Sequence, residues 1–99
     1  MEPIPFEIGR LVTSIQGRDR RRTFVVTGLP AEGFVLMSDG DTRKLDHPKK
    51  KKTKHLRAHP VVMETYGQLL REHRLKDSDV RSFLREQGFA QEQPLCEED

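Results

Sequence analysis

Short runs of β-branched and apolar residues, separated by turn signals, constrain the first 59 residues more than any other feature of the chain. Three such runs follow one another at Ile8 to Ile15, Thr23 to Leu29 and Phe34 to Met37. Turn residues separate them at Gln16-Gly17, Pro30 to Gly33 and Ser38 to Asp41. Short β-rich runs bounded by turns are typical of strands in sandwiches and barrels. We therefore expect a mainly β fold, and at 99 residues only a small barrel is feasible.

Two further strands are expected on either side of the lysine-rich segment, at Thr42 to Leu45 and at Lys54 to Ala58. This assignment leaves the four consecutive lysines in a loop. Before the fourth strand, Asp39-Gly40 favours a tight hairpin turn. Gly40 tolerates a positive φ, and the Asp39 carboxylate can accept hydrogen bonds from nearby backbone amides.

The hydrophobic period changes after Pro60, which suits the first position of a helix. Val62, Tyr66, Leu69 and His73 follow at helical spacing and predict a helix from about 60 to 74. Asp77 is expected to cap a second helix that carries Val80, Phe83 and Leu84 on one face. Gly88 is expected to end this helix, and Phe89 to pack back against it. We interpret the apolar stripe of Val62, Tyr66, Leu69 and Leu84 as core rather than as a groove for a partner. The predicted organisation is a barrel at 1–59, a helical pair packed on it at 60–89, and a disordered acidic tail at 90–99.

Composition narrows the class of protein. The one cysteine, Cys96, provides neither a disulfide framework nor a thiolate metal site, which favours a reducing compartment. No run approaches the roughly 18 apolar residues of a membrane span. The first residues include Glu2 and Pro3 instead of a basic segment followed by an apolar one, so no signal peptide is expected. These features predict a cytoplasmic protein, which we expect to be monomeric, without membrane contact.

Charge is distributed unevenly along the chain. Residues 1–59 contain 13 Lys and Arg against 7 Asp and Glu, a formal charge of +6, whereas residues 60–99 contain 5 against 9, a formal charge of −4. The net charge of +2 conceals this asymmetry. A basic segment of this kind indicates a polyanionic partner.

The basic residues concentrate next to the predicted strands. An arginine turn holds Arg18, Arg20, Arg21 and Arg22, and the lysine-rich loop and its flanks hold Arg43, Lys44, Lys49, Lys50, Lys51, Lys52, Lys54 and Arg57. In a small barrel two such loops can form one surface that binds phosphates and stacks on exposed bases. Binding of this kind weakens as salt rises. A solvated lysine run that binds nothing, or that serves as a localisation or solubilising segment, is the alternative for the lysines taken alone.

The stretch EIGRLVTSIQGRDRRRTFVV, from Glu7 to Val26, resembles the KOW motif, a short element of an SH3-like barrel in several ribosomal proteins and transcription elongation factors. Its glycine, apolar and basic positions correspond to Gly9, Val12, Ile15, Gly17, Arg18, Asp19, Arg20 and Val26. A second stretch, Val35 to Leu56, resembles bacterial KOW-domain RNA-binding proteins similar to the archaeal and eukaryotic large-subunit ribosomal proteins of the fourteen-e class. Together the two stretches cover residues 7–58.

The resemblance implies an SH3-like barrel that contacts RNA, in particular ribosomal RNA or the ribosome, through loop residues near Gly17. RNA-facing His55 belongs to the same predicted surface. Two positions depart from the motif, because Arg21 and Phe24 stand where it commonly has further glycines. Arg21 adds charge where glycine would add flexibility.

Other kinds of site have weaker support. His55 and His59 lack the further ligands of a zinc site, and Asp39, Asp41 and Asp46 lack the distal glutamate of a calcium loop. Phosphate-binding glycine motifs and a nucleophile elbow are absent from the sequence, so we expect neither cofactor nor catalysis. An adaptor that docks on ribosomal, translation or transcription factors is the main alternative to RNA binding. A methyl-lysine reader would need an aromatic cage, for which the chain offers only Tyr66 and five phenylalanines.

Overall fold

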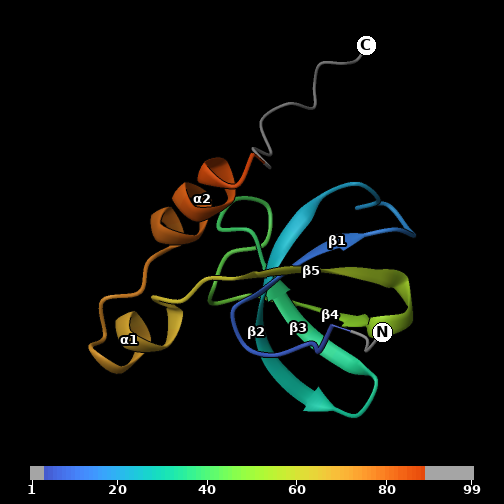
Figure 1. The fold of residues 1–99 in the computed structure, drawn as a ribbon, viewed down its shortest axis with the longest axis horizontal. Coiled ribbons are helices and arrows are strands. Elements are labelled where there is room, and N and C mark those ends of the chain that lie inside the picture. The colour runs from blue at the N-terminus through green and yellow to red at the C-terminus, as the bar shows by residue number, and fades with distance from the viewer. Residues whose placement is uncertain (1–3, 89–99) are drawn as a thin grey trace.

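A computed structural model describes residues 4–88 as one antiparallel sheet of five strands followed by two short helices (Figure 1). The strands are β1 (Arg10–Ser14), β2 (Thr23–Ala31), β3 (Phe34–Ser38), β4 (Lys49–Lys52) and β5 (Leu56–Val62). A 3₁₀ turn, η1 (Thr53–His55), precedes β5, and the helices are α1 (Tyr66–Arg71) and α2 (Asp77–Glu86). The predicted mainly β fold with two short C-terminal helices is therefore confirmed. Among the residues described, neither helix is long and apolar enough to cross a membrane.

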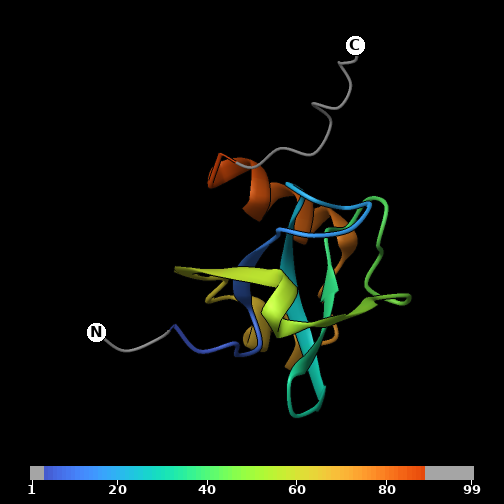
Figure 2. The same cartoon turned by 90° about the vertical axis from the view of Figure 1, so that its right-hand side faces the viewer.

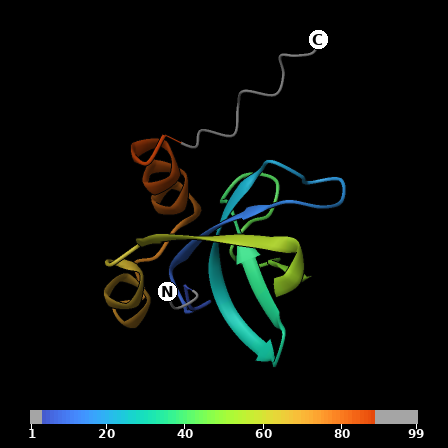
Figure 3. The same cartoon turned by 45° about the vertical axis from the view of Figure 1, so that its right-hand side comes forward.

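The sheet is strongly curled, and chain connectivity explains why. Its strand order is β4-β3-β2-β1-β5, so β4 and β5 lie at opposite edges although only η1 separates them in sequence. Four strand spacings in a flat sheet would place the edges about 19 Å apart. The four residue steps from Lys52 to Leu56 span at most about 14 Å. The edges must therefore approach each other at η1, as the ribbon shows (Figure 3), while β4 and β5 do not pair and the sheet stays open.

Each face of the sheet carries its own apolar core, because side chains alternate between the two faces along a strand. The helix-covered core contains Leu11, Val25, Met63, Tyr66, Val80 and Leu84. The inner core, on the concave face, contains Val12, Phe24, Val26, Val35, Met37 and Leu56. Tyr66, Leu69 and Leu84 thus contribute to the intramolecular core, as the apolar stripe predicted.

The predicted strand at Thr42 to Leu45 is wrong. These residues lie in a loop, residues 39–48, that the Asp39 side chain organises. Asp39 Oδ1 accepts hydrogen bonds from the backbone amides of Asp41 (2.8 Å) and Arg43 (2.9 Å), and Gly40 has φ +76°. The predicted role of the two residues holds, but they start a long loop rather than a tight hairpin. Strand pairing resumes only at Lys49, so the predicted lysine-rich loop is in fact strand β4.

The predicted helix from 60 to 74 is also wrong at its start. Pro60 and Val62 lie in β5, which crosses the predicted domain boundary at residue 59. Proline is tolerated there because β5 is an edge strand and its register with β1 shifts between Arg10 and Val12. Beyond β5, the amide of Met63 donates to the carbonyl of Gly9 (2.8 Å), so extended pairing continues and the helix begins only at Tyr66.

Helix α2 has the expected position but a different cap. Lys76 is the N-cap residue, and the carboxylate of Asp79 accepts a hydrogen bond from its backbone amide (2.8 Å). Asp77, the predicted cap, instead accepts the amide of Leu45 (2.7 Å) and so attaches the 39–48 loop to the helix. Gly88, with φ +86°, follows the end of the helix as expected. The predicted packing of Phe89 and the predicted disordered tail lie outside the described residues.

Candidate nucleic-acid interface

A buried carboxylate at the centre of the arginine turn joins that turn to β4. Asp19 Oδ1 accepts hydrogen bonds from Ser14 Oγ and Lys51 Nζ, each at 2.8 Å, and Lys49 Nζ lies 3.1 Å from Asp19 Oδ2. Lys51 Nζ also donates to the carbonyl of Gln16 at 2.7 Å. We call Ser14, Asp19, Lys49 and Lys51 the Asp19 cluster. It fixes the arginine turn against a strand 30 residues further along the chain.

The protonation of Asp19 reflects these contacts. Burial by itself would raise the pKa of the Asp19 carboxyl. The hydrogen bonds from Lys51 and Ser14, together with the Lys49 ammonium, outweigh burial and lower the pKa from 3.8 to about 2. Asp19 is therefore charged at neutral pH, and it offsets charge on two of the predicted RNA-binding lysines.

The four lysines of β4 alternate between two environments. Lys49 and Lys51 pair across the sheet with Met37 and Val35, whose side chains are buried in the inner core. The side chain of Lys51 is only 9% exposed. Lys50 and Lys52 are on the opposite face and exposed, and the ammonium of Lys50 lies 4.8 Å from the centre of the Phe34 ring. Lys50 and Lys52 are therefore the more accessible pair.

The arginine turn also contacts the 39–48 loop, and the two lie at the same end of the sheet (Figure 2). Arg22 Nη2 lies 3.2 Å from the fully buried carboxylate of Asp39. Arg22 is thus held in an ion pair within the fold. Arg43 and Lys44 lie exposed in the neighbouring loop. The sequence-predicted arginine turn and the segment that follows β3 therefore do form one end of the molecule.

A groove of about 400 Å³ opens beside the arginine turn, and we call it the arginine groove. It is lined by Thr13, Ser14, Ile15, Arg20, Arg21, Arg57 and His59. Thr13 pairs with Arg57 across β1 and β5, while Arg20 and Arg21 come from the turn. Within residues 4–88 the side chains of these three arginines form no ion pair or hydrogen bond, and all are exposed. Their charge is available to an anion.

Arg21 adopts an unusual backbone conformation. Its φ of +76° lies in the left-handed region, and its amide donates to the carbonyl of Ser14 at 2.7 Å. A side chain in this region costs about 1–2 kcal/mol relative to ordinary conformations, and glycine avoids that cost. Strained residues that the surrounding structure holds in place concentrate at functional sites. An arginine at this position indicates a role for its side chain.

Two histidines lie near the basic surface. Partial burial, followed by the charges of Lys54, Lys51 and Lys52, lowers the pKa of His55 below 6.5. Burial, followed by Arg57, lowers the pKa of His59, whose Nε2 lies 2.7 Å from Thr13 Oγ1. Both rings are therefore mainly neutral at pH 7. The described residues contain no group of three or more potential metal ligands.

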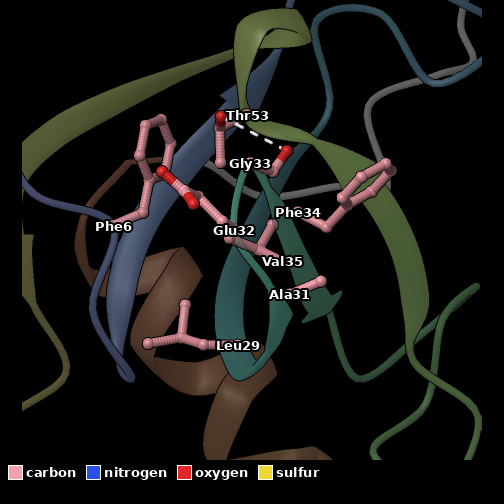
Figure 4. A pocket seen from close by; sticks show the side chains of 8 residues that line it. All are labelled: Phe6, Leu29, Ala31, Glu32, Gly33, Phe34, Val35 and Thr53. Atoms are coloured by element: carbon pink, nitrogen blue, oxygen red, sulfur yellow. Dashed lines mark hydrogen bonds between the residues drawn. The ribbon is translucent and has the colours of Figure 1, made fainter.

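A second hollow, of about 440 Å³, lies at the other end of β2 and β3. It is lined by Phe6, Leu29, Ala31, Glu32, Gly33, Phe34, Val35 and Thr53 (Figure 4). Leu29 is 53% exposed, and none of the sequence-predicted RNA-binding residues contributes to the lining. The ring of Phe34 points away from Phe6, so the two rings do not enclose one site (Figure 4). Among the residues that line this hollow, Glu32 is the only charged one, and its negative charge disfavours phosphate.

The structure sorts the predicted lysines and arginines into three groups. Arg20, Arg21 and Arg57 line the groove. The exposed cations of the arginine turn, the 39–48 loop, β4 and η1 are Arg18, Arg43, Lys44, Lys50, Lys52 and Lys54. Arg22, Lys49 and Lys51 are paired with carboxylates, and Gly17 (φ +97°) shapes the turn. The groove residues Thr13, Ser14, Ile15 and His59 were not among the predicted RNA-binding residues. Strand alternation places Thr13 and Ile15 on one face, which is the signal that identifies them.

No protein-family model matches the chain, and no curated protein matches it. The functional interpretation of the surface therefore depends on its own residues.

Proposed function

We propose that the chain is a non-catalytic, cytoplasmic RNA-binding protein, associated with the ribosome or with ribosomal RNA. The observation that supports this function best is the arginine groove, which Arg20, Arg21 and Arg57 line without any acidic residue beside them. Lys50 and Lys52 extend the positive surface along the exposed face of β4. Guanidinium groups bind phosphate in a bidentate manner and stack on bases, and lysines add phosphate contacts.

We also propose that the curled sheet is an SH3-like barrel of the KOW type. Support comes from the three-residue connection between the two edge strands and from the positions of glycine in the motif. Gly17 has φ +97°, and Arg21, at a position where the motif commonly has glycine, has φ +76°. The backbone at residue 21 is thus left-handed, as a glycine would permit, although the residue there is the cation Arg21.

Filter binding of a structured RNA at several salt concentrations tests the function. We expect binding that weakens steeply with salt, because each neutralised phosphate releases condensed cations. The matched control is a variant with Arg71→Gln and Arg85→Gln, which removes two exposed arginines from the helices. That control should retain binding, whereas Arg20→Gln with Arg57→Gln should lose most of it. Binding that is absent at low salt, or independent of salt, contradicts the proposal.

Protein docking is the second candidate function, and the specific observation that favours it is the hollow beside Phe6 and Leu29. In this account the chain is an adaptor for ribosomal proteins or for translation or transcription factors, and RNA contact is incidental. Nuclease treatment of a pull-down distinguishes the two functions. Release of the bound components by nuclease supports RNA binding, whereas their retention supports docking.

A further inference from the structure

We propose that the arginine groove receives one unpaired nucleobase, so that the protein prefers RNA with a bulged or single-stranded nucleotide over continuous duplex. The inference rests on the proposed function and names the class of RNA that the groove takes.

The lining of the groove includes one apolar side chain, Ile15, which phosphate binding alone would not need. Ile15 follows the last residue of β1 and is 48% exposed. Strand alternation places it on the same face as Leu11 and Thr13. Leu11 is covered by the core that Tyr66 and Leu84 complete, but that core does not include Ile15. The groove is therefore an uncovered continuation of the helix-covered face, and it offers one aliphatic contact to the flat face of a base.

The cations that line the groove come from two parts of the fold. Arg57 is adjacent to Thr13 across the β1–β5 pairing, and Arg20 and Arg21 come from the arginine turn. Guanidinium planes and apolar side chains are the groups on which proteins stack extruded bases, while adjacent arginines bind the flanking phosphates. A volume of about 400 Å³ lies in the range of about 300–1,000 Å³ typical of small-ligand sites.

Base pairing determines which RNA can use the groove. A base within a duplex is stacked on both faces and paired along its edge, so it cannot enter without the cost of being extruded. A bulged nucleotide has little of that cost. Phosphate contacts are available in both kinds of RNA. The groove therefore adds affinity for the unpaired nucleotide above a shared electrostatic contribution.

The test compares a blunt-ended RNA duplex with the same duplex carrying one bulged adenosine. Wild-type protein should bind the bulged RNA roughly tenfold more tightly, in keeping with the energy of stacking one base. Ile15→Ala should remove most of this preference, because it lowers affinity for the bulged RNA more than affinity for the blunt duplex. Leu70→Ala, which truncates an exposed leucine on α1 that does not line the groove, should preserve the preference.

A second measurement needs no variant. With 2-aminopurine at the bulge, binding should change the fluorescence of the base, since it moves between stacking environments. Equal affinity for the two duplexes, together with unchanged fluorescence, overturns the inference but leaves RNA binding intact. Failure to bind either duplex at low salt overturns the proposed function as well.

Discussion

Lys49 and Lys51 differ from Lys50 and Lys52 only in the face of β4 that they occupy, and their environments have little in common. The first pair contacts Asp19 and is mostly buried, whereas the second pair is exposed and includes the ammonium above the Phe34 ring. The arginine turn shows the same division, since Arg22 pairs with buried Asp39 while Arg20 and Arg21 line the groove. A count of basic residues therefore overstates the charge that a ligand meets. The basic residues that pair with Asp19 and Asp39 stabilise the surface on which the other basic residues are exposed.

The largest effect on stability is expected at Asp19, which pairs with the inward-facing Lys49 and Lys51. The pKa of Asp19 is lowered from 3.8 to about 2 in the folded state, so its ionised form contributes about 2 kcal/mol of stability. Asp19→Asn should lose about that amount, measured by urea unfolding at pH 7. Asp46→Asn is the control, since the ion pair of that carboxylate with His47 is exposed at the surface and its loss should leave the unfolding midpoint unchanged.

The pH dependence follows from the direction of the shift. Because the folded pKa is the lower one, the contribution of Asp19 is complete above pH 3.8 and is lost as the pH falls toward 2. The difference in stability between wild type and Asp19→Asn should shrink over that interval. A difference that stays constant down to pH 2 would show that the carboxylate acts by packing and not by charge.

The next largest difference in stability is expected between single alanine substitutions on the two faces of β4. Lys51→Ala removes two hydrogen bonds and leaves Asp19 with less compensation, which should cost about 1–2 kcal/mol. Lys50→Ala should change stability by less than about 0.5 kcal/mol, because its side chain is exposed. Thermal or urea unfolding of the two variants gives the comparison. Equal losses would mean that both faces stabilise the fold alike.

A smaller change of opposite sign is expected at Arg21. Glycine removes about 1–2 kcal/mol of left-handed strain but adds about 0.5–1 kcal/mol of unfolded-state entropy. Arg21→Gly should therefore stabilise the protein by about 0.5–1 kcal/mol while its RNA affinity falls. Arg18→Gly is the comparison variant, because Arg18 has no positive φ and gains nothing from glycine. Lower stability together with unchanged RNA affinity would remove the argument that strain at Arg21 serves binding.

Local sequence was sufficient for β1, β2 and β3, because each contains its own β-forming residues between turn signals. It failed for β4, since four lysines have neither apolar alternation nor high β propensity, and the strand forms by pairing with the edge of β3. Pro60 was misassigned because proline suits both a helix start and an edge strand. Whether Pro60 starts a helix or lies in an edge strand depends on the pairing of β5 with β1.

The candidate site was predictable in composition but not in arrangement. The basic residues were identified from charge and from the motif. Which of them are available depends on Asp19 and Lys51, which are 32 residues apart and meet only in the folded sheet. Ile15 was assigned to a strand and to an apolar position of the motif, whereas the structure leaves it 48% exposed in a groove that Arg57 also lines.

The salt dependence of RNA binding by two double variants tests the central claim most directly. Lys50→Gln with Lys52→Gln and Lys49→Gln with Lys51→Gln remove the same net charge, and circular dichroism establishes that each is folded under the assay conditions. If the outward lysines contact phosphates, their removal lowers the slope of log affinity against log salt by about 1.5, and removal of the inward pair lowers it by less than about 0.5. If the Lys49→Gln with Lys51→Gln variant unfolds, the single variant Lys49→Gln takes its place in the measurement. Equal slopes for the two pairs, or a larger loss for the inward pair, would contradict the account.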